Sequence, residues 1–388
     1  MNKMHSLRSL GSRMDIYFDY NASTPVDPVV AAAMRPYLET AFGNPSSGHW
    51  AGAPAKAALE RARGQVANLL NCEADEVVFT SGGSEADNFA IKGTWFAKRD
   101  QGNHIITTQI EHPAILNPCR FLETLGARVT YLPVSSEGRV DPEEVRRAIT
   151  PQTILISIMH ANSETGTIQP IAEISKLARA RGVTFHTDAA QSVGKITTDV
   201  RMLGVDLLTV VGHKMYAPKG IGALYVRRGV ELEPLIHGAG HELGRRAGTE
   251  SALLAVGLGA ACELASDLRP MRRVEALRDR LWEALRQSLG DAVVLNGPEQ
   301  GRLPNTLSVS FVGRRGTEVL ARLKRVAAST GMACHHGRPE LSPVLTAMGV
   351  PERVGLGAVR FSLGRYTTEL EVNTVIGELA NLAVMPAA

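Results

Sequence analysis

The stretch VTFHTDAAQSVGKITTDVRMLGVDLLTVVGHKMYAPKGIG, residues 183–222, contains two short apolar runs that each end in polar residues. The runs are VTFHTD (183–188) and VDLLTVVG (205–212), and their length and β-branched content predict buried strands. Asp188 ends the first run, and Lys214 lies two positions after the second. Because the carboxyl ends of parallel strands share one edge of a sheet, where ligands bind, we expect both side chains at that edge.

Short apolar runs alternate with longer amphipathic segments on both sides of this stretch. The strand-like runs span 76–80, 104–108, 128–134, 153–159 and 221–228, and the segments with helical spacing span 84–99, 112–126, 141–149 and 171–182. Short strands that alternate with helices predict βαβ units around a mostly parallel sheet. We therefore expect an α/β fold.

The pattern changes after RRAGTES (245–251). A helical stretch spans residues 253–289 and is interrupted near Arg269-Pro270. A strand-like run at 303–312, a helix from Thr317 and a further run at 359–372 follow it. Strands and helices that do not alternate regularly indicate an α+β unit. We expect a large domain over residues 15–262 and a smaller α+β domain formed by residues 1–14 and 263–388.

The composition excludes several classes of protein. A net charge of +3 over 388 residues does not indicate a surface that binds nucleic acid. No apolar run in the sequence is long enough to span a membrane. The first 14 residues are basic but lack the apolar core of a secretory signal. Four scattered cysteines without a C-x-x-C pair are typical of a reducing compartment, so we expect a cytoplasmic protein without a disulfide framework.

Three of the predicted strands end in residues that can carry chemistry: TSGGSEADN (80–88), HTDAAQ (186–191) and GHKMYAPKGIG (212–222). The glycines and the helix start at Ser84 favour an anion, although a tight turn before a capped helix explains the same residues. Asp188 needs a cationic partner to stay ionised in a dry site, or it caps a turn. A desolvated Lys214 can form a Schiff base, whereas a structural lysine would snorkel to water.

The three strand ends together match one cofactor. Pyridoxal 5'-phosphate needs an anion site for its phosphate, a carboxylate for its pyridinium nitrogen and a lysine for its aldehyde. The chain offers all three at the edge of one predicted sheet, in the order phosphate turn, Asp188 and Lys214. We therefore predict pyridoxal 5'-phosphate as the cofactor.

Further motifs extend the pattern over nearly the whole chain. Between YFDYNASTPVDP (17–28) and VRFSLGRYTT (359–368) they are FGNPSS, FTSGGSEADN, EHPA, ANSETG, HTDAAQSVGK, GHKMYAPKGIGALYVR, RRAGTES, LPNTLSVSF and ACHHG. With these motifs the chain resembles the cysteine desulfurase and selenocysteine lyase group of fold-type I pyridoxal phosphate enzymes, in the class V aminotransferase family. The resemblance implies a large domain with a mainly parallel seven-stranded sheet, a smaller α+β domain and a homodimer.

The resemblance also implies roles around the cofactor ring. Lys214 would hold the cofactor as an aldimine and later move the α-proton of the substrate. Asp188 would pair with the pyridinium nitrogen. His112 would stack on the ring as an acid/base candidate, and Gln191 would hydrogen-bond the phenolic oxygen.

The phosphate and the substrate have candidate residues of their own. The resemblance assigns the phosphate to Gly83, Ser84 and His213, with Thr249 reaching in from a second subunit. Asn44 and Arg360 would bind the substrate carboxylate, because a planar guanidinium fork suits two oxygens. A turn residue at Asn44 and a surface ion pair at Arg360 are the structural alternatives.

Two positions depart from the family pattern. Ser163 in ANSETG stands where the family usually has a second asparagine, near the phenolic oxygen of the cofactor. Its shorter hydroxyl is expected to reach that oxygen only through water. Val211 replaces a serine of many desulfurases, which removes one expected phosphate contact, and selenocysteine lyases share an apolar residue there.

Cys334 lies in the loop STGMACHHGRPELSP, residues 329–343, next to His335 and His336. A zinc site is a poor interpretation, because adjacent residues rarely point at one ion and no further ligand pair has metal spacing. A structural thiol would favour a regular apolar element. The leading hypothesis is that Cys334 is a nucleophile, and a charged neighbouring histidine would favour the thiolate form of Cys334.

These inferences predict a lyase that converts L-cysteine to L-alanine and leaves the sulfur on Cys334 as a persulfide, for a possible acceptor protein in iron–sulfur assembly. The alternative within the class is a selenocysteine lyase, which converts L-selenocysteine to L-alanine and selenide. An aminotransferase of the same fold and a non-catalytic scaffold are further alternatives. We expect no metal, nucleic acid or membrane partner.

Overall fold

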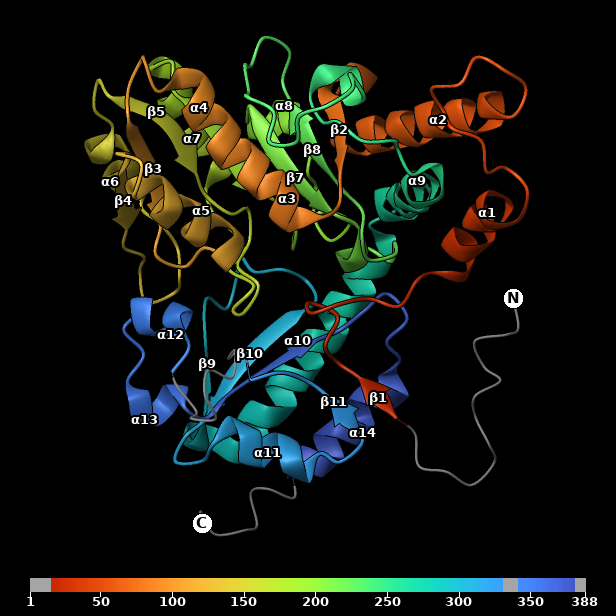
Figure 1. The fold of residues 1–388 in the computed structure, drawn as a ribbon. Helices are drawn as coiled ribbons and strands as arrows, with labels where there is room; N and C mark the ends of the chain where they lie inside the picture. The colour runs from red at the N-terminus through yellow and green to blue at the C-terminus, as the bar shows by residue number, and fades with distance from the viewer. Residues whose placement is uncertain (1–14, 331–340, 381–388) are drawn as a thin grey trace.

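The computed structural model describes residues 15–330 and 341–380, and a seven-stranded sheet forms the upper part of the molecule in Figure 1. The strands lie in the order β2, β8, β7, β6, β5, β3 and β4, and β8 runs in the direction opposite to the other six. Their bounds are Val77–Thr80 (β2), His104–Thr108 (β3), Arg128–Leu132 (β4), Thr153–Ser157 (β5), Thr184–Asp188 (β6), Leu207–Val211 (β7) and Gly222–Val226 (β8). Each strand lies within its predicted run, so the mainly parallel α/β sheet is confirmed.

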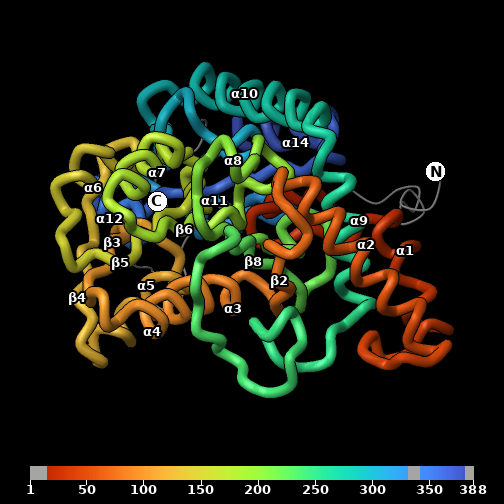
Figure 2. The backbone as a smooth tube through the Cα atoms, turned by 90° about the horizontal axis from the view of Figure 1, so that it is seen from above, coloured from red at the N-terminus to blue at the C-terminus, as the bar shows by residue number. Residues whose placement is uncertain are grey.

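Helices cover both faces of this sheet (Figure 1). One face carries α3 (Gly83–Asn88), the π-helical turn η2 (Phe89–Gly93), α4 (Thr94–Lys98) and α5 (Pro113–Glu123). The other carries α2 (Gly52–Leu70), α6 (Pro142–Ala148), α7 (Ile171–Ala180), α8 (Val200–Leu203) and α9 (Ala252–Ser266), with α1 (Pro28–Glu39) beside α9. Figure 2 shows α1, α2 and α9 side by side at one end of the sheet.

Side-chain caps fix where several of these helices begin. The Asp141 carboxylate accepts from the Glu143 N–H at 2.9 Å before α6, and Asp199 accepts from the Arg201 N–H at 2.8 Å before α8. Such caps satisfy N–H groups that the first helical turn leaves without acceptors. The segment predicted as one helix over 84–99 is continuous, but Phe89–Gly93 widens it to a π-helical turn.

A second hydrophobic core lies below the large sheet in Figure 1. It contains the antiparallel strands β9 (Val293–Leu295), β10 (Thr306–Phe311) and β12 (Ala358–Ser362), the parallel pair β1 (Ile16–Tyr17) and β11 (Val326–Ala327), and the helices α10 (Arg269–Leu289), α11 (Gly316–Arg322) and α14 (Glu369–Ala380). The predicted interruption of the long helical stretch lies between Ser266 and Arg269, where α9 ends and α10 begins.

Residues near the N-terminus pack with this second core. Ile16 and Phe18 are buried against α10, β10 and β12, whereas the predicted boundaries count residues 15–18 with the large domain. The predicted division near residue 262 stays a prediction. The chain therefore passes from the second core to the edge of the large sheet between Phe18 and α1, and residues 19–24 cross between the two.

A small apolar cluster joins the two parts of the molecule on another side. Val344, Leu345 and Met348, from and just after α12 (Pro343–Ala347), pack on Ile110 and Met159 beside the large sheet. The short helix α13 (Glu352–Gly355) follows. Cys334, His335 and His336 lie outside the described residues. In the described part, no helix is long and apolar enough to cross a bilayer, and Cys72, Cys119 and Cys262 are free thiols.

Candidate active site

A cavity of about 280 Å³ lies at the carboxyl edge of the large sheet. Its wall is built from residues that follow different strands, together with one residue of β12 from the second core. The predicted site residues that line it are Gly83, Ser84, His112, Ser163, Asp188, Gln191, His213, Lys214 and Arg360, and Val211 lines it as well. The cavity therefore brings together residues that lie up to 339 positions apart in the sequence, from Asn21 to Arg360.

Lys214 ends the turn η3 (Gly212–Lys214), which directly follows β7. Its Nζ donates a hydrogen bond to the main-chain carbonyl of Asn21, in the segment that crosses from the second core. Burial, and to a lesser extent the charge of Arg360, lowers the pKa of Lys214 from 10.5 to about 8, although the charges of Asp188 and Asp19 oppose this. A substantial fraction of the amine is therefore neutral near neutral pH, which a nucleophile or proton acceptor requires.

Asp188 is the last residue of β6, and its carboxylate faces the cavity from the sheet edge. Oδ1 accepts from the Ala190 N–H at 2.8 Å, but burial raises the pKa of Asp188 above its ordinary value. Asp87 lines the same cavity, and its Oδ1 has no hydrogen-bond donor within residues 15–330 and 341–380. Two buried carboxyl groups without a cation in bonding contact favour a ligand that brings positive charge.

His112 is the N-cap of α5, which fixes the orientation of its imidazole ring. Nδ1 accepts from the Ala114 N–H at 3.1 Å, so the single proton of the neutral ring is carried by Nε2. Burial lowers the pKa of His112 below its ordinary value, although the charge of Asp188 opposes this. The neutral ring is therefore favoured at the cavity wall, and its proton is on Nε2.

The turn after β2 forms the opposite wall. Gly83 and Ser84 begin the helical segment at the point where N–H groups of the first turn lack acceptors in the helix. A Cβ at residue 83 would lie 2.6 Å from Cγ2 of Val211, so only glycine fits against this valine. His213 lines the cavity between Val211 and Lys214, and its main-chain carbonyl accepts from the Thr24 N–H at 2.8 Å. The expected anion site thus consists mainly of backbone groups.

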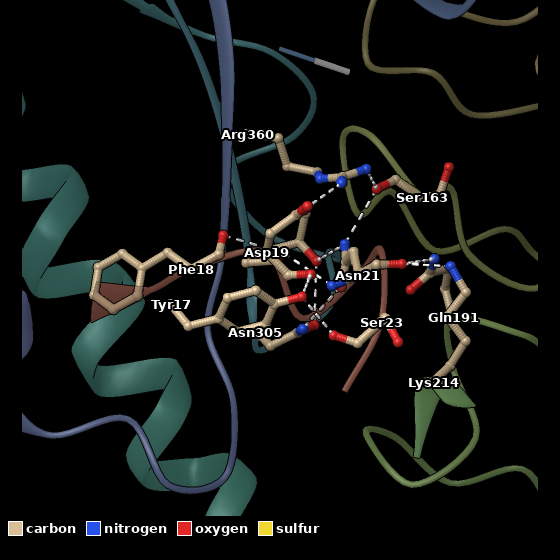
Figure 3. Close-up of polar contacts among 12 residues, drawn as sticks. Tyr17, Phe18, Asp19, Asn21, Ser23, Ser163, Gln191, Lys214, Asn305 and Arg360 are labelled. Carbon is tan, nitrogen blue, oxygen red and sulfur yellow. Dashed lines mark hydrogen bonds and ion pairs between the residues drawn. The ribbon is translucent and has the colours of Figure 1, made fainter. Parts of the chain in front are cut away.

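Asn21 connects several of these residues (Figure 3). Its main-chain carbonyl accepts from Nε2 of Gln191 at 3.0 Å as well as from Lys214. Its Nδ2 donates to the main-chain carbonyl of Ser163 at 3.1 Å and to Oγ1 of Thr306 at 2.9 Å. Asn21 is 1% exposed. This buried residue therefore ties the lysine, the ANSETG turn and the second core to one another.

The guanidinium of Arg360 reaches the cavity from β12. Nη2 contacts Oδ1 of Asp19 at 2.7 Å, and Nη1 donates to the main-chain carbonyl of Ser163 at 3.0 Å (Figure 3). Its Nε is buried and has no acceptor in the part of the chain that the structure describes. The side chain is therefore held on two sides and keeps donor capacity for a carboxylate.

The sequence matches the family model described as aminotransferase class-V over residues 16–375. The chain belongs to the class-V aminotransferase family. Cysteine desulfurase IscS of Dictyoglomus turgidum is 46% identical over 374 residues, which are 95% of each protein. A solved structure described as a NifS-like protein has a TM-score of 0.90 at 36% identity and covers 96% of this chain and 100% of that one. A structure described as SspA in complex with cysteine has a TM-score of 0.82 at 40% identity and covers 91% and 100%.

Enzymes of the class-V aminotransferase family use pyridoxal 5'-phosphate. The residues of this chain fit that group. Asp188 offers a carboxyl group at the sheet edge to a pyridinium, and the backbone turn at Gly83 suits a phosphate. Lys214 supplies a buried amine of lowered pKa on the same cavity. No group of three or more His, Cys, Asp or Glu among the described residues could hold a metal ion.

Two predicted site residues do not reach this cavity in the single chain. Thr249 lines a separate cavity of about 100 Å³ with Ser81 and Arg246. Asn44 is exposed, and its Oδ1 accepts from the Ser46 N–H at 2.9 Å, which is the geometry of a turn residue. The roles of Thr249 and Asn44 stay predictions, as does that of Cys334, which lies outside the described residues.

Sequence reasoning missed four polar residues around the site: Asp19, Asn21, Asp87 and Lys195. The first two lie in YFDYNASTPVDP, which the sequence analysis used as a motif without assigning chemistry to it. Their position could have been predicted, since Asp19 and Asn21 follow a short apolar run, in the same way that polar residues follow the strands of the large sheet. Asp87 and Lys195 lie within FTSGGSEADN and HTDAAQSVGK, next to residues that were identified.

Proposed function

We propose that this chain is a pyridoxal-phosphate-dependent cysteine desulfurase that converts L-cysteine to L-alanine and keeps the sulfur on Cys334 as a persulfide. The observation that carries this proposal is the single cavity that combines Lys214, Asp188 and Arg360. Relatives that are named cysteine desulfurases match nearly the full length of the chain, and one solved neighbour is described as a complex with cysteine. These names support cysteine as the substrate.

The cofactor would be held by residues on three sides of the cavity. Asp188 would pair with its ring nitrogen, the turn at Gly83 and Ser84 would hold its phosphate with His213, and His112 would cover its ring. Pyridoxal phosphate, when bound, supplies an electron sink for the bonds at the α-carbon of an amino acid. A carboxylate at the ring nitrogen keeps that nitrogen protonated, which strengthens the sink.

Lys214 and His112 are the proton carriers of the site. Because its pKa is about 8, Lys214 can accept the α-proton of the substrate and return a proton at neutral pH. His112 lines the cavity as a neutral ring that carries its proton on Nε2, so it would donate a proton to a leaving or developing anion. The hydrogen bond to Asn21 holds the Lys214 amine at the sheet edge while it is unprotonated or protonated.

Arg360 would bind the α-carboxylate of the substrate. Nη1 and Nη2 each make one contact, to Ser163 and to Asp19, and Nε has no acceptor among the described residues. A charge-assisted fork of this kind fixes the orientation of a carboxylate as well as its position.

Cys334 would take the sulfur. Its thiolate attacks the substrate sulfur, so that an S–S bond forms while the C–S bond breaks, and the electron pair of that bond stays with the three-carbon fragment that becomes alanine. The persulfide then passes to a thiol or an acceptor protein. We also propose a cytoplasmic location, which the free thiols Cys72, Cys119 and Cys262 support.

A homodimer is part of the proposal. Segments 45–49 and 239–243 line one surface cleft of about 900 Å³, and Trp50 beside the first is 83% exposed. Phe42 is 82% exposed and Leu243 is 67% exposed. Several large apolar side chains that are exposed near one another are typical of an interface between subunits. Thr249 follows the second segment and would complete the phosphate site of the partner.

The test compares L-cysteine with L-selenocysteine as substrates of the purified protein loaded with pyridoxal phosphate, with and without a thiol reductant. The proposal predicts alanine from cysteine, with repeated turnover when reductant is present. Alanine from selenocysteine alone would instead indicate a selenocysteine lyase. Formation of a new amino acid from a 2-oxo acid would indicate an aminotransferase, and protein that stays colourless after addition of the cofactor would indicate a scaffold.

A further inference from the structure

Lys195 is a buried lysine to which the proposed reaction gives no task. The residue is 8% exposed, and within residues 15–330 and 341–380 no carboxylate pairs with it. Burying an amine costs free energy unless the amine forms hydrogen bonds or an ion pair. The hydrogen bonds of Lys195 therefore indicate what the side chain does.

Both hydrogen bonds of Lys195 end on one residue. Nζ donates to the main-chain carbonyl of Gln191 at 2.9 Å and to its side-chain Oε1 at 3.0 Å. Both acceptors are carbonyl oxygens, so Lys195 donates to them whether its amine is protonated or neutral. The turn that brings Lys195 back to Gln191 needs Gly194, whose φ is +73° and where a Cβ would lie 2.9 Å from Cβ of Ala265.

The contacts of Gln191 determine which side of its carboxamide carries the oxygen and which carries the nitrogen. Nε2 donates to the main-chain carbonyl of Asn21 at 3.0 Å, and that oxygen can only accept. The atom that faces Lys195 must be Oε1, and the atom that faces Asn21 must be Nε2. Two contacts from opposite sides therefore agree on one orientation of the amide, and one hydrogen of Nε2 remains unused.

Gln191 in this orientation lies on the wall of the cofactor cavity, beside Lys214. Lys195 lies behind it, on the wall of a second cavity of about 20 Å³ that Lys214 also lines. The carbonyl of Asn21 accepts from both Gln191 and Lys214. Lys195 is thus linked to the reacting lysine through Gln191 and Asn21, without facing the larger cavity itself.

This inference rests on the proposed function. We propose that Lys195 is a positioning residue, which holds the Gln191 carboxamide so that an N–H, and not a carbonyl oxygen, is presented to the phenolic oxygen of bound pyridoxal phosphate. Removing the Lys195 amine leaves Oε1 as a buried acceptor without a donor. The amide then loses one of its two constraints, and cofactor binding weakens although Lys195 does not touch the cofactor.

The test titrates cofactor-free protein with pyridoxal phosphate and measures its dissociation constant and the absorbance maximum of the bound form. Lys195→Met removes both hydrogen bonds and is expected to weaken binding about tenfold, the usual scale for losing a strong buried hydrogen bond. Lys195→Arg keeps donor groups, and the adjoining small cavity leaves room for them. It is expected to restore binding to within about threefold of the original chain and to restore the absorbance maximum.

A double-mutant cycle separates positioning from a general loss of stability. If Lys195 acts through Gln191, then Lys195→Met has less than about a twofold effect on cofactor affinity in a Gln191→Met background. Equal weakening in both backgrounds would overturn the proposal, and so would an unchanged dissociation constant in Lys195→Met alone.

Gln191→Glu provides a further test that keeps the contact with Lys195. The new carboxylate can pair with the Lys195 amine, but it replaces the N–H that donates to the Asn21 carbonyl and presents oxygen to the cavity. It is expected to bind pyridoxal phosphate more weakly than Gln191→Met does, and affinity equal to that of the original chain would contradict the proposal. If the original chain itself fails to bind pyridoxal phosphate, the proposed function fails, whereas normal binding that Lys195→Met leaves unchanged contradicts only the role of Lys195.

Discussion

Nη2 of Arg360 lies 2.7 Å from Oδ1 of Asp19, so the residue proposed to bind the substrate carboxylate already carries an ion pair. The pair joins β12 of the second core to the segment that leads into the large sheet. Arg360 also donates to the main-chain carbonyl of Ser163, and its guanidinium is therefore fixed before any substrate arrives. This preorganisation reduces the ordering cost of binding a small amino acid.

Arg360→Lys is expected to raise the KM for L-cysteine about tenfold to hundredfold, with a smaller change in kcat. A lysine supplies a point charge but cannot hold Asp19, Ser163 and a carboxylate at once. Steady-state alanine production measures both constants. Arg353→Lys, at an exposed arginine of the same part of the fold, is the matched control and should leave both unchanged. An unaltered KM in Arg360→Lys would remove Arg360 from the substrate site.

The reactivity of Lys214 should follow its pKa of about 8. Only the neutral amine is nucleophilic, so its labelling by acetic anhydride in cofactor-free protein should increase with pH and reach half of its maximum near pH 8. An ordinary lysine reaches that point near pH 10.4. Peptide mass spectrometry after brief labelling at a series of pH values gives the curve. A midpoint for Lys214 near that of an ordinary lysine would show that burial does not lower its pKa.

Glu111 makes the stability of the cofactor-free protein depend on pH. Its carboxyl accepts from Thr108 and from the Met159 N–H, and burial raises its pKa from 4.5 to about 8. Because the folded pKa is the higher one, the folded chain keeps a proton that the unfolded chain releases between pH 4.5 and 8. The contribution of Glu111 to stability is therefore complete below about pH 4.5 and is lost as the pH rises toward 8.

Thermal unfolding at pH 5 and at pH 8 checks this expectation. Between these pH values, the Tm of the original chain should fall by at least about 2 °C more than that of Glu111→Gln, which has no carboxyl to ionise. Glu137→Gln, at an exposed glutamate, should behave like the original chain. Parallel curves for the original chain and Glu111→Gln would mean that Glu111 ionises normally in the folded state.

The sequence predicted the strands well because each is a short apolar run whose polar end marks the sheet edge. Asp188 and Lys214 were found for this reason, since Asp188 ends such a run and Lys214 lies two positions after another. Asp19 and Asn21 also follow a short apolar run, but their contacts were not predicted, because their partners Arg360 and Lys214 are 341 and 193 positions away in the sequence. Lys195 was missed because its importance comes from an environment without a carboxylate, which composition and spacing do not reveal.

Cys334 should matter for one substrate more than for another. Cys334→Ala is expected to abolish sulfur release from L-cysteine, because the variant lacks the thiol that is proposed to accept the sulfur. Cleavage of L-selenocysteine should largely persist, since a selenol is the better leaving group. Alanine release from each substrate measures the two activities, and Cys72→Ala serves as the matched control. Equal losses on both substrates would contradict this distinction.

The most direct test of the account measures alanine formed from L-cysteine by the protein loaded with pyridoxal phosphate, beside its Lys214→Ala and Lys219→Ala variants. Lys219 is exposed in the same loop and provides the matched control. The account predicts alanine from the original chain and from Lys219→Ala, and a rate at least about a thousandfold lower in Lys214→Ala, which lacks the proton carrier. Cofactor-loaded original protein that forms no alanine, or Lys214→Ala protein that forms it at an unchanged rate, would contradict it.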